Sequence, residues 1–504
     1  MDKMTNFESK LFSSFNIGGI KPERITLSYR DNFRIINDRL KDLLGERADW
    51  KLNLDKYYSS EEYLSSCRIV SNVDDIPELS LNDIQKMISA DEQYKNKANR
   101  LLSLDKIISN NSVSNEKYLE AIYEATAIIG LFEGDTCPLF DWISDRKGIK
   151  LSDLPLIINN DPRIRTYPIL SIIINSISSL FVSGNLYSFT GVDTVMSQPK
   201  TKYYYRGENA FYNSSKAGYF RSTRDQSAIS ELIDLLRSSE AGYFLDNFDA
   251  VKYWNKCSVN YLALLQHYGF KTKMIDITSS LMTALFFACC TYENNTWRPL
   301  HKEEFEKPNS RKSVYMHGGD SRYAIIYRSL TEINDIQRAL YNEDPFDRYI
   351  TPVGYQPFMR CATQSAYMLY SKEELDLYKY SEFEKYKIRL SEELCQLVFE
   401  QSHHGNDIYP KNDIADIHNY FEMINNTRCF SKPLFDRLCS DLKLSRLDIK
   451  NFKAQLKNYR YKIQNKTYII RKEELEKINQ SYPIEKAYEL CGIEPCAKPI
   501  VVIS

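Results

Sequence analysis

The sequence lacks the features that mark several large classes of protein. Its 504 residues carry a formal net charge of -1, so no overall field draws the chain toward nucleic acid or an anionic membrane. The 11 cysteines include no CxxC pair and no regular spacing, which argues against a structural zinc site and a disulfide framework. P-loop, GxSxG and GxGxxG motifs are also missing, so NTPase, α/β-hydrolase and Rossmann folds have no motif support.

Signals for a membrane span and for secretion are missing as well. The longest uncharged run, residues 166–192, is interrupted by serine, asparagine and glycine. This composition predicts a buried helix and a turn at Ser183–Asn185 rather than a membrane span. The first residues show no basic segment followed by an apolar stretch. We therefore expect a cytoplasmic protein with reduced thiols and no membrane contact.

Composition and length predict a globular protein of several domains. Hydrophobic residues make up 43% and charged residues 26%, and a chain of this length has room for about three domains. We expect an α+β protein in which a central mixed α/β domain, residues 196–420, lies between two mainly helical regions. These are residues 1–195 and a basic region, residues 421–504, with the character of a helix-turn-helix or winged helix.

Local patterns place several elements within these regions. Apolar residues recur at helical spacing over residues 80–108 and 115–132. Short β-prone segments at 202–205 and 323–328 predict strands. Residues 386–390 alternate like an edge strand, and Ser391 is placed to cap the helix that follows.

The first motif with chemical content follows a β-prone tyrosine triad. Arg206 and Gly207 come at the end of the predicted strand, followed by Glu208. A guanidinium at a strand end suits phosphate recognition, and a glycine lets a ligand or another backbone approach closely. The same residues also fit an arginine paired with a structural carboxylate in a turn, and the sequence leaves both interpretations open.

A second motif lies between two predicted apolar helices. The first helix ends at Gly269 after Gln266 and His267, and a β-prone segment then leads to Asp276. Residues 278–280 read Thr-Ser-Ser and precede the second helix. These polar groups either line a site or do structural work, since a Thr-Ser-Ser cluster caps helices and a single histidine is often a core residue.

The two motifs together resemble the FRG domain family, which is named for a Phe-Arg-Gly-type motif. The resemblance rests on Tyr205, Arg206, Gly207, Gln266 to Gly269, Thr272, Asp276, Thr278, Ala284 to Ala288, Arg360, Gln364 and Gly405 to Pro410. It covers about residues 200–420 and implies a bacterial protein of the kind found in antiphage defence, abortive infection or toxin-like settings. Lys273 stands where the family usually has arginine, which would lose a bidentate contact.

The order of these residues also parallels the ADP-ribosyltransferases of the Arg-Ser-Glu type. In that chemistry an arginine holds the NAD phosphates, a serine or threonine supports the ribose, and a glutamate stabilises the developing positive charge. Gln364 stands where the glutamate would be needed, and an amide carries no negative charge. Either Glu208, Asp276 or Glu393 takes that role, or the domain binds a nucleotide without cleaving it.

We therefore expect the central domain to bind a nucleotide-like small molecule, with NAD as a candidate substrate and no metal. The residues expected to act in catalysis are Arg206, His267, Asp276 and Gln364. Those expected to contact the ligand are Tyr205, Gly207, Glu208, Gln266, Thr272, Lys273, Thr278, Ser279, Ser280 and Arg360.

The basic region supports an alternative function. Between residues 428 and 472 the sequence has 13 basic and three acidic residues, a local net charge of +10. Arg446, Lys450, Lys453 and Lys457 are spaced by three or four, which places them on one side of a helix. This pattern fits contact with a phosphate backbone, and it also fits a solvated helix pair docked on a protein partner. The chain would then be a non-catalytic sensor or interaction module for nucleic acid or a phage protein.

Overall fold

The computed structural model describes twelve segments of the chain. These are residues 73–129, 182–189, 192–199, 201–221, 228–253, 261–294, 296–330, 348–353, 359–371, 374–409, 415–465 and 472–481. Within them, no helix is both long and apolar enough to cross a membrane.

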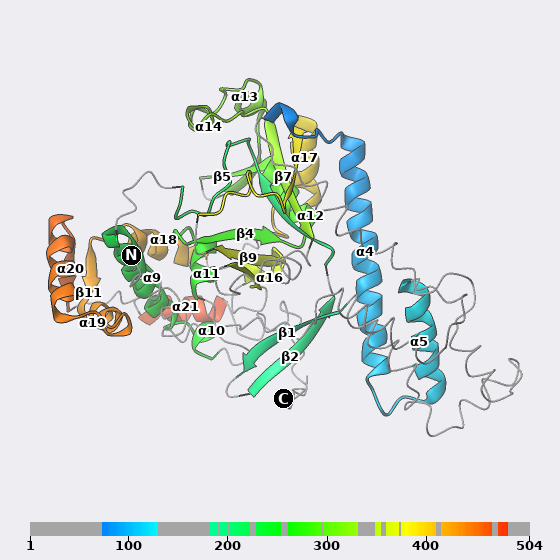
Figure 1. The fold of residues 1–504 in the computed structure, drawn as a ribbon, viewed down its shortest axis with the longest axis horizontal. Coiled ribbons are helices and arrows are strands. Elements are labelled where there is room, and N and C mark those ends of the chain that lie inside the picture. The colour runs from blue at the N-terminus through cyan, green and yellow to red at the C-terminus, as the bar shows by residue number, and fades with distance from the viewer. Residues whose placement is uncertain are drawn as a thin grey trace, which may run out of the picture.

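A six-stranded sheet forms the centre of the molecule (Figure 1). Its strands are β3 (Tyr203–Glu208), β4 (Met274–Thr278), β7 (Tyr323–Leu330), β8 (Arg348–Pro352), β9 (Ala366–Ser371) and β10 (Glu384–Arg389), in the spatial order β10-β7-β3-β4-β9-β8. Every pair of neighbouring strands is antiparallel. The α+β class is confirmed, and β10 is the edge strand that the alternation in residues 386–390 predicted.

Helices cover one face of this sheet. α12 (Leu281–Cys289) and α17 (Glu392–Gln401) share a core with Tyr205 of β3, Ile326 of β7 and Ile388 of β10. Ser280 caps α12 and Ser391 caps α17, each by accepting a backbone N–H three residues on. Both caps lie where the sequence predicted them.

The opposite face is covered mainly by connecting segments. Tyr204, Ile277, Ile325 and Tyr327 point to this side and pack against Phe211 together with aromatic and leucine side chains from residues 375–383. Because successive strand residues alternate, Tyr205 and Gly207 face α12, whereas Tyr204, Arg206 and Glu208 face the other way. This alternation decides on which side each polar group of the sheet lies.

A glycine is required at position 207 because the backbone of α12 packs directly on β3 there. A Cβ added at this position would lie 1.8 Å from the carbonyl oxygen of Ala284 and 2.7 Å from its carbonyl carbon. The close approach that the glycine permits is therefore that of a helix backbone, one of the two possibilities the sequence left open.

The N-terminal elements are joined to the same sheet. A 3₁₀ turn (η1, Val73–Asp75) precedes α4 (Leu81–Ile108), and Glu78 forms a parallel bridge with Lys387 of the edge strand β10. α4 begins at a capping box made by Ser80 and Asp83, and α5 (Asn115–Ile129) packs beside its C-terminal half. Both helices confirm the helical spacing of the sequence.

One local prediction is wrong. Residues 182–189 form β1 (Val182–Phe189), which pairs with β2 (Val192–Pro199) in an antiparallel hairpin. Ser183–Asn185 therefore lie inside a strand rather than in a turn, and this part of the uncharged run is not helical. Cross-strand pairing outweighs the turn preference of these polar residues. The proposed boundary at residue 195 falls inside β2, and residues 166–181 lie outside the described part.

A group of helices stands beside the sheet, towards the left of Figure 1. It contains α9 (Ala228–Leu245), α10 (Asp249–Lys252), α11 (Tyr261–His267), α18 (Ala415–Asn425), α19 (Lys432–Asp441), α20 (Arg446–Asn458) and α21 (Lys472–Ser481), with the short parallel pair β11 (Cys429–Ser431) and β12 (Lys462–Gln464). α9 shares a core with α19 and α20 through Ile233, Leu236, Phe435 and Phe452. Residues 466–471, which follow β12, lie outside the described part.

The remaining elements are short. They are β5 (Cys290–Glu293), β6 (Thr296–Pro299), α13 (Lys302–Phe305), α14 (Lys312–Met316) and α16 (Met359–Thr363). α13 and α14 lie on the chain between β6 and β7. α16 comes directly before β9, and Gln364 lies in the short connection between these two elements.

Candidate functional site

The candidate site begins at a splay between the two central strands. β3 and β4 are paired at Tyr205 and Thr278, and beyond this point no further pairing joins them. The Arg206 side chain crosses the opening, where Nη1 donates to the carbonyl oxygen of Asp276 at 2.8 Å. A guanidinium thus replaces the backbone hydrogen bonds that a regular ladder would make here.

Arg206 is also paired with a buried carboxylate. Its Nε donates to Glu208 Oε1 at 3.2 Å, and the same carboxylate accepts from Ser215 Oγ at 2.7 Å and from the Tyr327 hydroxyl at 3.4 Å. Burial by itself lowers the pKa of Arg206, but Glu208 and Asp276 more than offset it and the pKa is raised. We call Arg206, Glu208, Ser215 and Tyr327 the Arg206 cluster. Arg206 is paired with a structural carboxylate as predicted, but both residues lie within β3 rather than in a turn. A ligand contact by Arg206 stays a prediction.

A second cluster lies on the α12 side of the splay. Thr278 is in register with Tyr205, so Asp276, two residues earlier, points to the same face as Gly207. Gln266 Nε2 donates to Asp276 Oδ2 at 3.2 Å, and Thr272 Oγ1 donates to Gln266 Oε1 at 2.6 Å. The turn at Gly269, which has a φ of +85°, ends α11 and brings Gln266 back toward β4.

Two buried polar atoms of this cluster have no hydrogen-bond partner among the described residues. They are Asp276 Oδ1 and His267 Nε2. Burial lowers the pKa of His267, and the charge of Arg360 lowers it further, while the charge of Asp276 and a side-chain hydrogen bond with Gln364 act in the opposite direction. The imidazole is therefore neutral at pH 7, with one ring nitrogen able to donate and the other to accept. We call Gln266, His267, Thr272, Asp276 and Gln364 the Asp276 cluster.

Thr278, Ser279 and Ser280 connect the start of α12 to the segment before β9. Thr278 Oγ1 donates to the carbonyl oxygen of Gln364 at 2.6 Å and accepts from the Ser280 backbone N–H at 3.0 Å. The Ser279 N–H donates to the carbonyl oxygen of Ser365 at 3.1 Å. The structural interpretation of the Thr-Ser-Ser cluster predicted the cap but not the link to residues 364 and 365.

Gln364 and Arg360 lie beside His267. Gln364 is buried, and its side-chain Nε2 donates to the carbonyl oxygen of Ile408 at 3.3 Å. The Arg360 guanidinium sits over the rings of Tyr268 at 5.0 Å and Tyr409 at 4.3 Å. Two residues from the later part of the expected site are thus brought to the motif of α11.

The FRG domain model matches residues 201–296. The chain carries an FRG domain. The match spans β3, α11, β4 and α12, and therefore most residues of both clusters. The segments around Gln364 and Gly405 lie outside it, although Gln364 contacts the FRG residues in the fold. No curated protein and no solved structure matches the chain significantly.

Three expected contact residues of the FRG domain lie away from the two clusters. The Tyr205 hydroxyl donates to Asp91 Oδ1 of α4 at 3.4 Å, on the face that α12 covers. The space beside Gly207 is filled by the backbone of α12. Lys273 lies with its ammonium over the ring of Tyr219 at 5.2 Å. Glu393, an alternative acid, is exposed in the first turn of α17.

The sequence interpretation missed Arg221. Its guanidinium forms no hydrogen bond or ion pair with any residue that the structure describes, and the residue is exposed. Partial burial and the charge of Arg206 lower its pKa, while the charges of Glu208, Asp276 and Tyr212 act in the opposite direction, so Arg221 lies within electrostatic range of both clusters. No motif surrounds Arg221, so only the fold reveals it.

The adjacent residues His403 and His404 make separate contacts. His403 is exposed and its Nδ1 lies 2.7 Å from Asp407 Oδ2. His404 packs against Phe399 instead. Among the described residues no group of three histidine, cysteine or acidic side chains could hold a metal ion.

Proposed function

We propose that the FRG domain of this chain binds a nucleotide-like ligand at the Asp276 cluster and acts as a bacterial effector of the antiphage or toxin type. The observation that carries the proposal is the pair of unsatisfied buried atoms, Asp276 Oδ1 and His267 Nε2. Buried polar atoms are nearly always hydrogen-bonded, and leaving one without a partner costs about 1–3 kcal/mol. A ligand that supplies both partners recovers this cost.

The charges around the cluster favour a nucleotide over an uncharged ligand. A carboxylate oxygen accepts hydrogen bonds from ribose hydroxyls or an exocyclic amine, and the neutral His267 adds a second polar contact. Arg221 offers an exposed cation near Asp276 and Arg206 for a phosphate group. The buried Arg206 adds a fixed positive charge behind it.

Asp276 is also the acid best suited to NAD cleavage. Glu208 already accepts from Arg206, Ser215 and Tyr327, whereas Asp276 keeps one oxygen free. In such a reaction the bond between ribose and nicotinamide breaks, nicotinamide leaves with the bonding electrons, and water or an acceptor attacks the sugar and loses a proton. A carboxylate beside the sugar stabilises the positive charge that develops on it.

Calorimetric titration tests the binding step. We expect ADP-ribose and NAD to bind the full chain, and Asp276→Asn to weaken both by about 10- to 100-fold, the value of a hydrogen bond to a charged group. Glu392→Gln removes an exposed carboxylate of α17 and serves as the matched control. Equal affinities for all three proteins would contradict the proposal.

The same proteins test turnover and the biological setting. Mass spectrometry after incubation with NAD should detect free nicotinamide, or an ADP-ribosylated acceptor, with wild type and the control but not with Asp276→Asn. Bacteria that express the wild type should plate phage less efficiently, or grow more slowly, than bacteria that express the variant. Binding without turnover would support a nucleotide sensor.

The basic helix pair favours a second function that does not depend on the FRG site. Arg446, Lys450, Lys453 and Lys457 are all exposed on α20. A chain that uses this surface alone would be an interaction module, and its FRG residues would serve the fold. Asp276→Asn would then leave every activity of the chain unchanged.

A further inference from the structure

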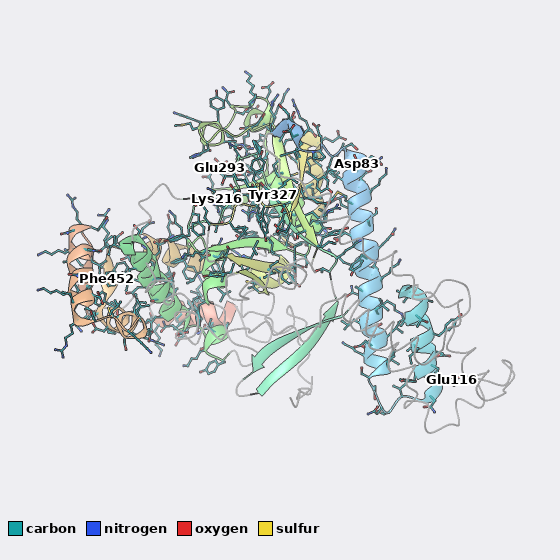
Figure 2. All side chains as sticks on the ribbon, in the orientation of Figure 1. Asp83, Glu116, Lys216, Glu293, Tyr327 and Phe452 are labelled. Carbon is teal, nitrogen blue, oxygen red and sulfur yellow. The ribbon has the colours of Figure 1, made fainter. Side chains whose placement is uncertain are left out.

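The α19 and α20 helices form a compact unit with a fixed turn. Ser445 accepts from the Asp448 backbone N–H at 3.2 Å, and Asp448 Oδ2 accepts in return from the Ser445 N–H at 3.2 Å. Phe452 and Leu456 of α20 are buried against α9 and α19. Phe452 lies on the side of α20 that faces α9 (Figure 2). One side of α20 is therefore packed against α9 and α19, and the opposite side faces solvent.

One side of α20 carries a row of cations, Arg446, Lys450, Lys453 and Lys457, which we call the cation strip. All four are exposed, and none forms an ion pair with an acid in the described part of the chain. The acids of α19 are used within that helix, where Asp436 pairs with Lys432 and Asp441 with Arg437. The positive charge of the strip is therefore not neutralised by its nearest helix.

The strip lies at the rim of the molecule. α20 is the outermost element on the left of Figure 1, with α9 on its inner side. Asn451 and Asn458 are also exposed on α20, about a third of a turn around the helix from the strip, and Tyr459 at the end of the helix is 47% exposed. Amides and aromatic rings are groups that contact bases and sugars.

We propose that α20 docks in the major groove of double-stranded DNA, with the cation strip on the phosphates. The strip spans 11 residue steps, or about 16 Å at 1.5 Å per residue, and the groove is about 12 Å wide, enough for one helix. In helix-turn-helix proteins the second helix takes this position while the first crosses the backbone. α19 and α20 have this order.

The chemistry of the helix separates DNA from other polyanions. Membrane-bound amphipathic helices need a broad apolar face, and the free side of α20 offers a single large apolar residue, Leu447, which is 65% exposed. Double-stranded RNA has a deep and narrow major groove that does not admit a helix. An acidic protein would also match the charge, and a poly-glutamate peptide in the binding test distinguishes it from DNA.

Fluorescence anisotropy with the full chain and a labelled 20-base-pair duplex tests the proposal. Four phosphate contacts give a slope of about -3.6 when the logarithm of the association constant is plotted against the logarithm of the salt concentration. Raising the salt from 50 to 200 mM should therefore weaken binding by about 150-fold. Lys450→Glu, Lys453→Glu and Lys457→Glu together should reduce that dependence to a change of about fourfold or less.

A matched charge reversal separates the strip from net charge. Lys302→Glu, Lys307→Glu and Lys312→Glu change the net charge equally at exposed positions around α13 and α14, and this protein should bind DNA with the wild-type salt slope within about one unit. Replacing the three α20 lysines by glutamine gives the same test with a smaller perturbation of the helix. Melting curves of all variants establish that they are folded.

Several results would overturn the proposal. They are failure of the wild type to bind the duplex at 50 mM salt, equal loss in both triple variants, and tighter binding to double-stranded RNA or to a poly-glutamate peptide than to DNA. Asp276→Asn should leave DNA binding unchanged, so the failure of this proposal and the failure of the FRG ligand proposal are distinguishable.

Discussion

Gly207→Ala should be among the most destabilising single substitutions in the FRG domain. The new Cβ would lie 1.8 Å from the Ala284 carbonyl oxygen, where contacts below 3.0 Å are essentially not seen, so β3 and α12 must separate by more than 1 Å. Ala284 is fully buried, and Gly207 lies between the buried residues Tyr205 and Glu208 of β3. Overpacking of this kind costs about 3 kcal/mol or more, which lowers the melting temperature of a domain this large by about 6–12 °C.

Gly242→Ala is the matched control because it adds the same methyl group to another helix-associated glycine. Gly242 lies in α9, and the added Cβ would lie 3.7 Å from Cδ1 of Tyr261 in α11, which is an ordinary van der Waals contact. Alanine in a helix is favoured over glycine by about 0.5–1 kcal/mol, so this variant should melt slightly higher than the wild type. Thermal melts followed by circular dichroism compare the three proteins. A melting temperature within 2 °C of the wild type corresponds to a loss of about 1 kcal/mol or less in the free energy of unfolding. That result for Gly207→Ala would refute the packing of α12 on β3.

Two further predictions concern the helices around the basic region. Burial raises the pKa of Glu240 from 4.5 to about 7, although its carboxylate accepts a hydrogen bond from the Ser431 N–H. Between these two pH values the folded state binds more protons than the unfolded state, so the stability falls as pH rises through this window. Glu240→Gln should therefore stabilise the protein at pH 8, by up to about 3 kcal/mol, and have little effect at pH 4.5, in melts at both pH values. Ser445→Ala removes the cap of α20 and should cost about 1 kcal/mol, detected as faster hydrogen exchange in its first turn; unchanged exchange would contradict the cap.

Much of the local structure was predictable because capping residues and periodicity act over a few positions. Ser391 begins a helix as the sequence indicated, and the strand around Arg206 lies where the tyrosine triad placed it. Pairing between distant segments was not predictable in the same way. Ser183 belongs to a strand because β2 pairs with it, and α9 shares a core with residues 421–504 across a predicted boundary.

The candidate site was predictable in composition but not in arrangement. The sequence placed Gln266, Asp276 and Gln364 in one cluster because the family motif groups them, and the structure brings them together. It did not indicate that Arg206 and the Asp276 side chain lie on opposite faces, which depends on the register of β3 and β4. Arg221 could not be found, because nothing in its neighbouring sequence distinguishes it from a surface arginine.

A structure of the protein crystallised with ADP-ribose, at a concentration that saturates binding in the calorimeter, tests the central claim most directly. The account predicts that the ligand places polar atoms within hydrogen-bonding distance of Asp276 Oδ1 and His267 Nε2, with a phosphate group near Arg221. A ligand bound elsewhere, with both atoms still unpartnered, would contradict the account.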